Sequence, residues 1–308
     1  MKQSVALIKE KNTINISILT KLKNTLNNII FYIFCTCSIL LLGSILIGIV
    51  YFVGKTGLKV FSDVSFKDYF FSLQWDPFAE HYGVGAFIIG TFALMGLTLL
   101  FCVPFSLIVA IYISEYASGK FKKVYRSILD LLVGIPSVVY GFIGLTIFVP
   151  FIRDFFHQDY GHGIAAASLV LAIMVLPTIT RIADTTIESI PNSIREASYS
   201  LGATKFQVIL KSVLPAAKSG IFTAIILGMT RAIGETMAVV MVIGNTPILL
   251  SGITSPTSVM TTSIVTEILN VDFDSTWNYA LYMMAFLLLL ISLIFIVLIR
   301  FLKGKGEN

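Results

Sequence analysis

Residues 191–215 read PNSIREASYSLGATKFQVILKSVLP, a polar stretch between two long apolar runs. Its first half predicts a short helix with Ser193 as N-cap and Glu196 closing a capping box three residues later. Gly202 suits a sharp stop of that helix, because glycine adopts left-handed backbone angles without steric cost. The pattern therefore predicts a helix that ends in a tight turn.

The second half of the stretch repeats this pattern. Thr204 and Gln207 have capping-box spacing, and apolar residues follow them at helical intervals. Pro215 stands where the next helix should begin, a position that tolerates proline. We expect two short amphipathic helices that project from one side of a membrane. Physical reasoning alone leaves two interpretations: the hairpin lies flat on lipid headgroups, or it docks into a groove of a partner protein.

The rest of the chain is strongly apolar. Hydrophobic residues make up 56% of the 308 residues and charged residues only 13%, too few to cover the surface of a soluble domain of this length. Six apolar runs are long enough to cross a bilayer as helices. They cover residues 29–53, 82–114, 131–152, 163–180, 219–243 and 275–299. The predicted fold class is an all-α polytopic membrane protein with six transmembrane helices.

The basic residues predict the orientation. The segments before the first run, between the second and third, between the fourth and fifth, and after the sixth hold 17 of the 22 lysines and arginines. The positive-inside rule places both termini and the segment 191–215 in the cytoplasm. The formal net charge of +5 forms no single basic patch, so nucleic-acid binding is not expected.

The stretch 191–215 also resembles the EAA loop of ABC-importer permeases, in its Glu-Ala start, its glycine six residues later and its closing Leu-Pro. Ser198 and Ser212 depart from that pattern, where Ala and Ile are usual. In the family this loop docks on a cytoplasmic ATPase, so the resemblance favours the docking interpretation. The residues assigned to ATPase coupling are Glu196, Ala197, Ser198, Gly202, Ala203, Leu214 and Pro215.

Two charges stand inside the fifth apolar run. With that run taken as one helix, Arg231 lies at its middle and Glu235 follows four residues later on the same face. An arginine at the centre of a membrane helix costs about 2.5–3.5 kcal/mol. One interpretation is a structural salt bridge between packed helices. The other is a solute path, because the guanidinium can donate two hydrogen bonds to a tetrahedral oxyanion. Thr230 and Thr236 are assigned to the same path.

This run carries a narrower resemblance. RAIGETMAVVMVIGN at 231–245 and GIPSVVYG at 134–141 are similar to characteristic stretches of phosphate permeases of the PstC type. The resemblance covers about residues 85–302 and implies a five-helix permease core preceded by an extra N-terminal helix. It implies a heterodimer with a homologous second permease, two ATPase subunits on the cytoplasmic face and a phosphate-binding protein outside, in a bacterial plasma (inner) membrane. ATP and Mg²⁺ would bind the partner ATPase, and no cofactor is expected in this chain.

Other functions remain open at this stage. The solute could be another oxyanion such as sulfate or molybdate. An intramembrane enzyme would need paired carboxylates or a nucleophile with its base inside the spans, and Arg231 with Glu235 supplies neither. A membrane scaffold without transport is disfavoured by the EAA-like loop. No phosphate-cradling Gly-Lys-Ser/Thr loop occurs, and the histidines and cysteines show no metal-ligand spacing.

The expected organisation has five parts. Residues 1–28 form a cytoplasmic segment, 29–53 the first helix, 54–84 an outer loop, 85–302 the permease domain, and 303–308 a cytoplasmic tail. Asp130 is expected at the N-terminus of the third helix, where the helix dipole stabilises an acid. The outer segment 244–274 is rich in Ser and Thr, namely Thr254, Ser255, Thr257, Ser258, Thr261, Thr262 and Ser263. Those side chains are interpreted as a gate and landing surface for the binding protein, or as ordinary surface polarity.

Overall fold

The computed structural model describes residues 2–306, with side chains described for 28–298 and 301. The chain divides into two units, residues 1–52 and 53–308. Helix α1 (Lys2–Leu58) makes up the described part of the first unit and enters the second. Its residues between 28 and 52 carry apolar side chains on all sides, and nearly all are exposed. That is the pattern of a helix surrounded by lipid, and the first candidate span is Asn28–Ser62.

The second unit holds five further helical segments long and apolar enough to cross a membrane, which confirms the predicted class of six spans within the described residues. These spans are Gly85–Tyr116, Ser137–Phe156, Ile164–Glu188, Lys205–Gly234 and Thr276–Leu298. Their main helices are α3 (Gly85–Ile111), α5 (Ser137–Ile143), α6 (Val149–Phe156), α7 (Ile164–Glu188), α9 (Lys205–Val208), α10 (Leu214–Gly234) and α13 (Thr276–Gly306). Wider, π-helical turns extend three of them, at Tyr112–Tyr116, Gly144–Phe148 and Ile209–Val213.

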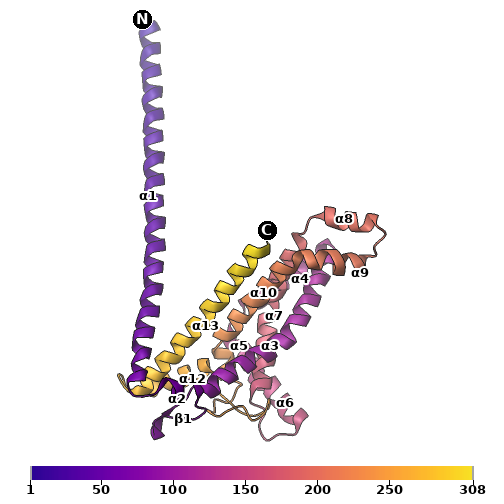
Figure 1. Ribbon diagram of the computed structural model, residues 1–308. Coiled ribbons are helices and arrows are strands. Elements are labelled where there is room, and N and C mark those ends of the chain that lie inside the picture. Colours follow the sequence, from indigo (N-terminus) through magenta and orange to yellow (C-terminus); the bar gives the residue numbers. More distant parts are fainter. Residues whose placement is uncertain (1, 307–308) are drawn as a thin grey trace. The chain divides into compact units, whose positions relative to one another are not determined.

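Shorter elements close the two ends of this unit (Figure 1). They are α2 (Phe66–Phe71), α4 (Gly119–Gly134), α8 (Asn192–Ser200), α11 (Met237–Val240), α12 (Met260–Glu267), 3₁₀ turns at Lys59–Ser62, Pro77–Ala79 and Ile268–Asn270, and the strands β1 (Trp75–Asp76) and β2 (His81–Tyr82). The strands pair antiparallel, with Trp75 opposite Tyr82. We call the end with α8 and α9 the loop end and the end with β1 and β2 the strand end.

Helix α7 forms the centre of the second unit, packed against α3, α4 and α10. Most of its side chains are buried. Two glycines two turns apart on α10 allow its close approach to α7. A Cβ on Gly228 would lie 2.6 Å from the side chain of Ile179, and one on Gly220 would lie 2.2 Å from Thr186. Small residues at such contacts are typical of membrane helices, because backbones must come close for dispersion forces to act.

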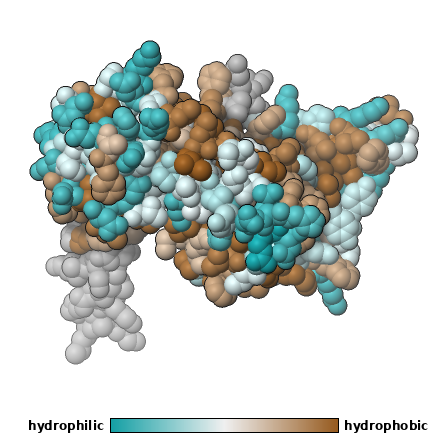
Figure 2. Space-filling view, turned by 90° about the horizontal axis from the view of Figure 1, so that it is seen from below, coloured by the Kyte–Doolittle hydropathy of each residue, from teal (hydrophilic) through white to brown (hydrophobic). Residues whose placement is uncertain are grey.

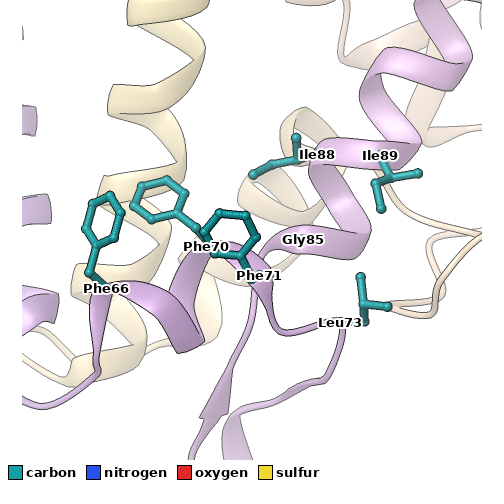
Figure 3. A pocket seen from close by; sticks show the side chains of 7 residues that line it. All are labelled: Phe66, Phe70, Phe71, Leu73, Gly85, Ile88 and Ile89. Atoms are coloured by element: carbon teal, nitrogen blue, oxygen red, sulfur yellow. The ribbon is translucent and has the colours of Figure 1, made fainter.

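The strand end carries polar patches and aromatic side chains. Figure 2 looks at this end and shows hydrophilic residues gathered between hydrophobic ones. Phe66, Phe70 and Phe71 of α2 line an open apolar pocket of about 450 Å³ with Ile88 and Ile89 of α3 (Figure 3). The segment 54–84, expected as a loop, therefore contains a helix and a β-hairpin.

Several predicted spans have different bounds in the structure. The first continues past 53 to Ser62, and the fifth begins at Lys205 rather than 219. The third begins at Ser137 rather than 131, because Ile135 and Pro136 interrupt the helix and leave α4 as a separate element. The fourth continues past 180 to Glu188, and the fifth ends at Gly234 rather than 243. The placement of Asp130 at a helix N-terminus is wrong. It lies in the last turns of α4, where its carboxylate pairs with Arg181 (3.4 Å).

Candidate functional site

The loop end presents the predicted pair of short helices, α8 and α9, joined by a glycine turn. Gly202 has a φ of +79°, as the sharp stop requires. Thr204 Oγ1 accepts the N–H of Gln207, and Gln207 Oε1 accepts the N–H of Thr204, so the second capping box is confirmed. Pro215 occupies the first turn of α10, as expected. The hairpin is thus determined largely by local chemistry.

The first capping box is wrong. Helix α8 begins at Asn192 after Pro191, and no side chain caps it, so neither Ser193 nor Glu196 closes a box. The fixed φ of proline starts the helix two residues earlier than the cap spacing predicts. Glu196 instead lies exposed on the outside of the hairpin.

The hairpin exposes one side to its surroundings and packs the other against the bundle. Ala197 is exposed, and Leu201 and Phe206 expose 88% and 64% of their surface. Ala203 and Leu214 pack on the opposite side against a core cluster built largely from α3, α7 and α10. Exposed large apolar side chains beside an exposed carboxylate are typical of a docking surface.

Ser198 and Ser212, the two departures from the EAA pattern, contact each other. Their hydroxyl oxygens are 2.8 Å apart, which joins α8 to the π-helical turn before α10. This hydrogen bond joins the two positions at which Ala and Ile are usual in the EAA pattern.

The second predicted site lies at the end of α10, and its geometry differs from the expectation. Arg231 is in the last turn of α10, not at the middle of a span. Its Nη1 donates to Thr178 Oγ1 of α7 at 2.8 Å, and none of the ion pairs among the described residues includes it. Since one neutral acceptor takes one of its five N–H donors, the guanidinium keeps donors for another ligand.

Glu235 does not share a helix face with Arg231. It follows the last residue of α10 with extended backbone angles (φ −74°, ψ 127°), and its Oε1 accepts the N–H of Ala238 at 3.2 Å. An acid at the start of α11 satisfies one of the free N–H groups there. The predicted pairing of the two charges is therefore wrong, because the helix breaks between them.

The two threonines assigned to the path bond to nearby backbone. Thr230 Oγ1 donates to the carbonyl of Ile226 (3.0 Å), and Thr236 Oγ1 donates to that of Gly234 (3.4 Å). Both are half-buried. Each hydroxyl oxygen can still accept a hydrogen bond.

Most of the named Ser and Thr side chains of the segment 244–274 do not form a polar surface. Five of its seven named side chains are buried, namely Thr257, Ser258, Thr261, Thr262 and Ser263. Thr262 Oγ1 accepts the N–H of Val259, and Thr261 Oγ1 donates to the carbonyl of Glu235. The irregular backbone around α12 is packed inside the protein, so its polar groups need internal partners. The interpretation of these five as a landing surface is wrong.

Glu267, at the end of α12, binds both tryptophans of the chain. Trp277 Nε1 donates to Oε2 at 2.8 Å, and Trp75 Nε1 lies 3.1 and 3.2 Å from the two carboxylate oxygens. Burial raises the pKa of Glu267, and the two indole donors and Ser263 oppose that shift.

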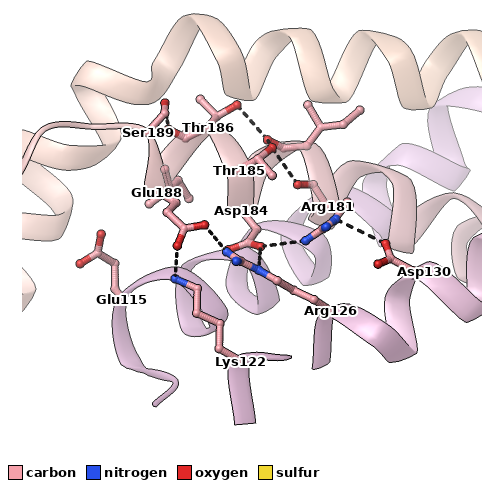
Figure 4. A network of polar contacts seen from close by, with 12 residues as sticks. Glu115, Lys122, Arg126, Asp130, Arg181, Asp184, Thr185, Thr186, Glu188 and Ser189 are labelled. Atoms are coloured by element: carbon pink, nitrogen blue, oxygen red, sulfur yellow. Dashed lines mark hydrogen bonds and ion pairs between the residues drawn. The ribbon is translucent and has the colours of Figure 1, made fainter. Parts of the chain in front are cut away.

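Sequence reasoning missed a charge network between α4 and α7 (Figure 4). Asp184, which is fully buried, accepts Arg126 Nε at 2.7 Å and Nη2 at 3.0 Å. Glu188 binds Arg126 and also Lys122, at 2.8 Å. These residues recur at helical spacing on both helices, a signal that the sequence does contain. The apolar run 163–180 stops before Asp184 and Glu188, and the spacing does not show that their cations come from α4.

Comparisons with known proteins identify the family. Residues 102–305 match the family described as "Binding-protein-dependent transport system inner membrane component". The chain belongs to this family of ABC-importer permeases. The permease is 43% identical over 265 residues to a protein of Bacillus subtilis named "Probable ABC transporter permease protein YqgH", covering 85% of this chain and 86% of that one.

One further relative and one solved structure are also similar to the permease. It is 32% identical over 256 residues to the "Phosphate transport system permease protein PstC" of Haemophilus influenzae, covering 76% and 80% of the two chains. The solved structure of a bacterial ABC transporter that imports the polysaccharide alginate superposes with a TM-score of 0.56 at 16% identity, over 87% of this chain and 95% of that one. The permease is therefore a multi-pass transporter subunit of the ABC-importer type.

Proposed function

We propose that the permease forms part of the path for inorganic phosphate in an ATP-driven importer. The observation that carries the proposal is the free capacity of Arg231. Arg231 lies in the last turn of α10, beside the helix break. Its guanidinium donates to the hydroxyl of Thr178 and forms no ion pair among the described residues. A planar guanidinium donates two parallel hydrogen bonds to a phosphate, so such a side chain suits this anion. The similarity to PstC supports the same solute.

Glu235 has a separate role in this proposal. Its carboxylate holds the start of α11 through the N–H of Ala238, rather than neutralising Arg231. Thr230, Thr236 and Arg231 then line the path near the break between α10 and α11. The break leaves backbone N–H and C=O groups without partners in the helix. In membrane proteins such groups face a water-filled cavity or are buried against other protein segments.

The proposed assembly follows from the loop end. The exposed face with Glu196, Ala197 and Leu201 docks on one of two ATPase subunits, which bind ATP and Mg²⁺ on the cytoplasmic side. Both termini are then cytoplasmic, in agreement with the distribution of lysine and arginine. A homologous second permease completes the path, and a phosphate-binding protein delivers the solute at the strand end.

Uptake of radiolabelled phosphate tests the solute. Cells without their own high-affinity permease would express this chain with its second permease, ATPase and binding protein. We expect saturable uptake that requires this chain and that excess sulfate or molybdate does not reduce. Uptake abolished by sulfate or molybdate would reassign the importer to another oxyanion.

A further inference from the structure

The turn Tyr112–Tyr116, between α3 and α4 at the loop end, has an unusual backbone. Its five residues are wound as a π-helix, with the N–H of Ala117 donating to the carbonyl of Tyr112 at 2.9 Å. Within the described part of the chain, Ser114 Oγ is buried and has no hydrogen-bond partner. Isolated π-turns and unsatisfied buried polar groups both cost stability, and they occur often at functional positions.

Helices α8 and α9 with their glycine turn form what we call the coupling hairpin. Its first helix, α8, contacts the turn Tyr112–Tyr116 through an ion pair. Arg195 on α8 places Nη2 at 2.7 Å and Nε at 3.2 Å from Glu115 Oε1. Both side chains are largely buried, with 15% and 9% exposed. The same guanidinium donates to the carbonyl of Ile187 in the last turn of α7 and to that of Ile190 just after it. Arg195 therefore ties the hairpin to two membrane helices at once.

The second helix of the hairpin holds the next residue of the turn. Lys205 Nζ on α9 lies 4.2 Å from the ring centroid of Tyr116, a cation–π contact. Adjacent residues of one turn thus receive one cation from each helix of the hairpin. If the coupling hairpin moved without the turn, Glu115 would keep a largely buried negative charge without its cation, which is energetically costly. The hairpin and the turn are therefore expected to move together.

We propose that the turn Tyr112–Tyr116 receives the motion of the coupling hairpin and passes it to α3 and α4. Glu115 and Arg195 are positioning residues for transport in this account. The turn joins α3 to α4, and α4 is bound to α7 by the charge network of Figure 4, so a displacement at the turn reaches two helices packed on α7. The inference rests on the proposed function in one respect, that the hairpin docks on an ATPase.

A double-mutant cycle on the complete importer tests this link. The variants Glu115→Gln, Arg195→Gln and the double variant keep hydrogen-bonding groups and remove the charges. Arg153→Gln is the matched control, since it breaks an exposed ion pair with Asp154 (51% and 68% exposed) on α6. Three quantities would be measured in proteoliposomes: the amount of ATPase that co-purifies, the rate of ATP hydrolysis, and solute taken up per ATP.

We expect each single charge removal to lower uptake per ATP about two- to thirtyfold, the range of mutations along coupling networks. The ATPase should still co-purify in normal amounts, and the double variant should lose no more than the worse single one. The Arg153 control should match the wild type. Unchanged uptake per ATP in Glu115→Gln, effects that multiply in the double variant, or loss of the ATPase from the complex would each overturn the proposal.

Failure of the proposed solute would be distinguishable. If the wild-type complex hydrolyses ATP in response to its binding protein but takes up no phosphate, the solute assignment fails alone. The same cycle is then evaluated on ATP hydrolysis stimulated by the binding protein, where the non-additive pattern is still expected.

Discussion

Replacement of Asp184 by asparagine tests the charge network between α4 and α7. Asp184 is fully buried and accepts two hydrogen bonds from Arg126, at 2.7 and 3.0 Å. Asparagine has nearly the same shape and keeps one acceptor oxygen, but it removes the charge opposite the guanidinium. The remaining anion beside Arg126 is Glu188, which is 45% exposed.

The expected loss of stability follows from these contacts. Removal of one partner of a buried ion pair costs about 3–5 kcal/mol. Because Arg126 is 22% exposed and keeps Glu188, we take the lower end, about 3 kcal/mol. Each kcal/mol shifts the melting temperature of a chain of roughly this size by about 2–4 °C, so Asp184→Asn should lower it by about 6–12 °C.

Thermal unfolding of the purified permease in detergent measures this shift. The matched control is Asp154→Asn in the exposed pair with Arg153, for which about 0–1 kcal/mol is expected. The double variant Arg126→Gln with Asp184→Asn should recover part of the loss, because the Arg126 guanidinium then no longer faces a missing carboxylate. The recovery is partial because Arg181, which lies 3.8 Å from Asp184, keeps only Asp130 as its ion-pair partner among the described residues. Equal melting temperatures for Asp184→Asn and Asp154→Asn would refute the reasoning.

Three further predictions concern other parts of the chain. Both tryptophans bind Glu267, so tryptophan fluorescence should change as pH rises through a value above 4.5, and Glu267→Gln should abolish the change. Because the folded pKa is raised, the protonated carboxyl favours the folded state below the unfolded pKa, and this stability is lost as pH rises through the folded pKa; a fluorescence profile that is flat in the wild type would contradict this. Ser198→Ala alone should cost about 1 kcal/mol in thermal unfolding, and Ser198→Ala with Ser212→Ala no more than that; additive losses would argue against their hydrogen bond. Gly202→Ala should lower the free energy of unfolding by about 1–2 kcal/mol, because the φ of Gly202 is +79°. Gly134→Ala, whose added Cβ meets open space, should leave the free energy of unfolding unchanged. Equal effects of the two variants on thermal unfolding and on ATPase co-purification would contradict the account of a strained turn at Gly202.

The parts of the fold that local chemistry determines were predictable from the sequence. Apolar runs of sufficient length gave the six spans, since no other backbone arrangement hides its polar groups in lipid as readily as a helix. Gly202, Thr204 with Gln207, and Pro215 were placed correctly, because turns and caps depend on neighbouring residues only. Ser193 was misplaced as a cap because the proline before α8 fixes the helix start.

The parts that depend on tertiary packing were not predictable in this way. The four-residue spacing of Arg231 and Glu235 predicts one face only while the helix continues, and no proline marks the break after Gly234. Asp184 was overlooked because its cation, Arg126, comes from α4. The polar side chains around α12 were assigned to the surface because composition alone does not show that the segment folds back into the protein.

Phosphate uptake by Arg231 variants tests the central claim most directly. The importer would carry Arg231→Gln or Arg231→Lys, with co-purification of all subunits as the control for assembly. We expect the glutamine variant to lose uptake nearly completely and the lysine variant to keep part of it, because lysine retains the charge without the planar fork. Phosphate uptake at the wild-type rate by an assembled Arg231→Gln importer would contradict the assignment of this arginine to the phosphate path.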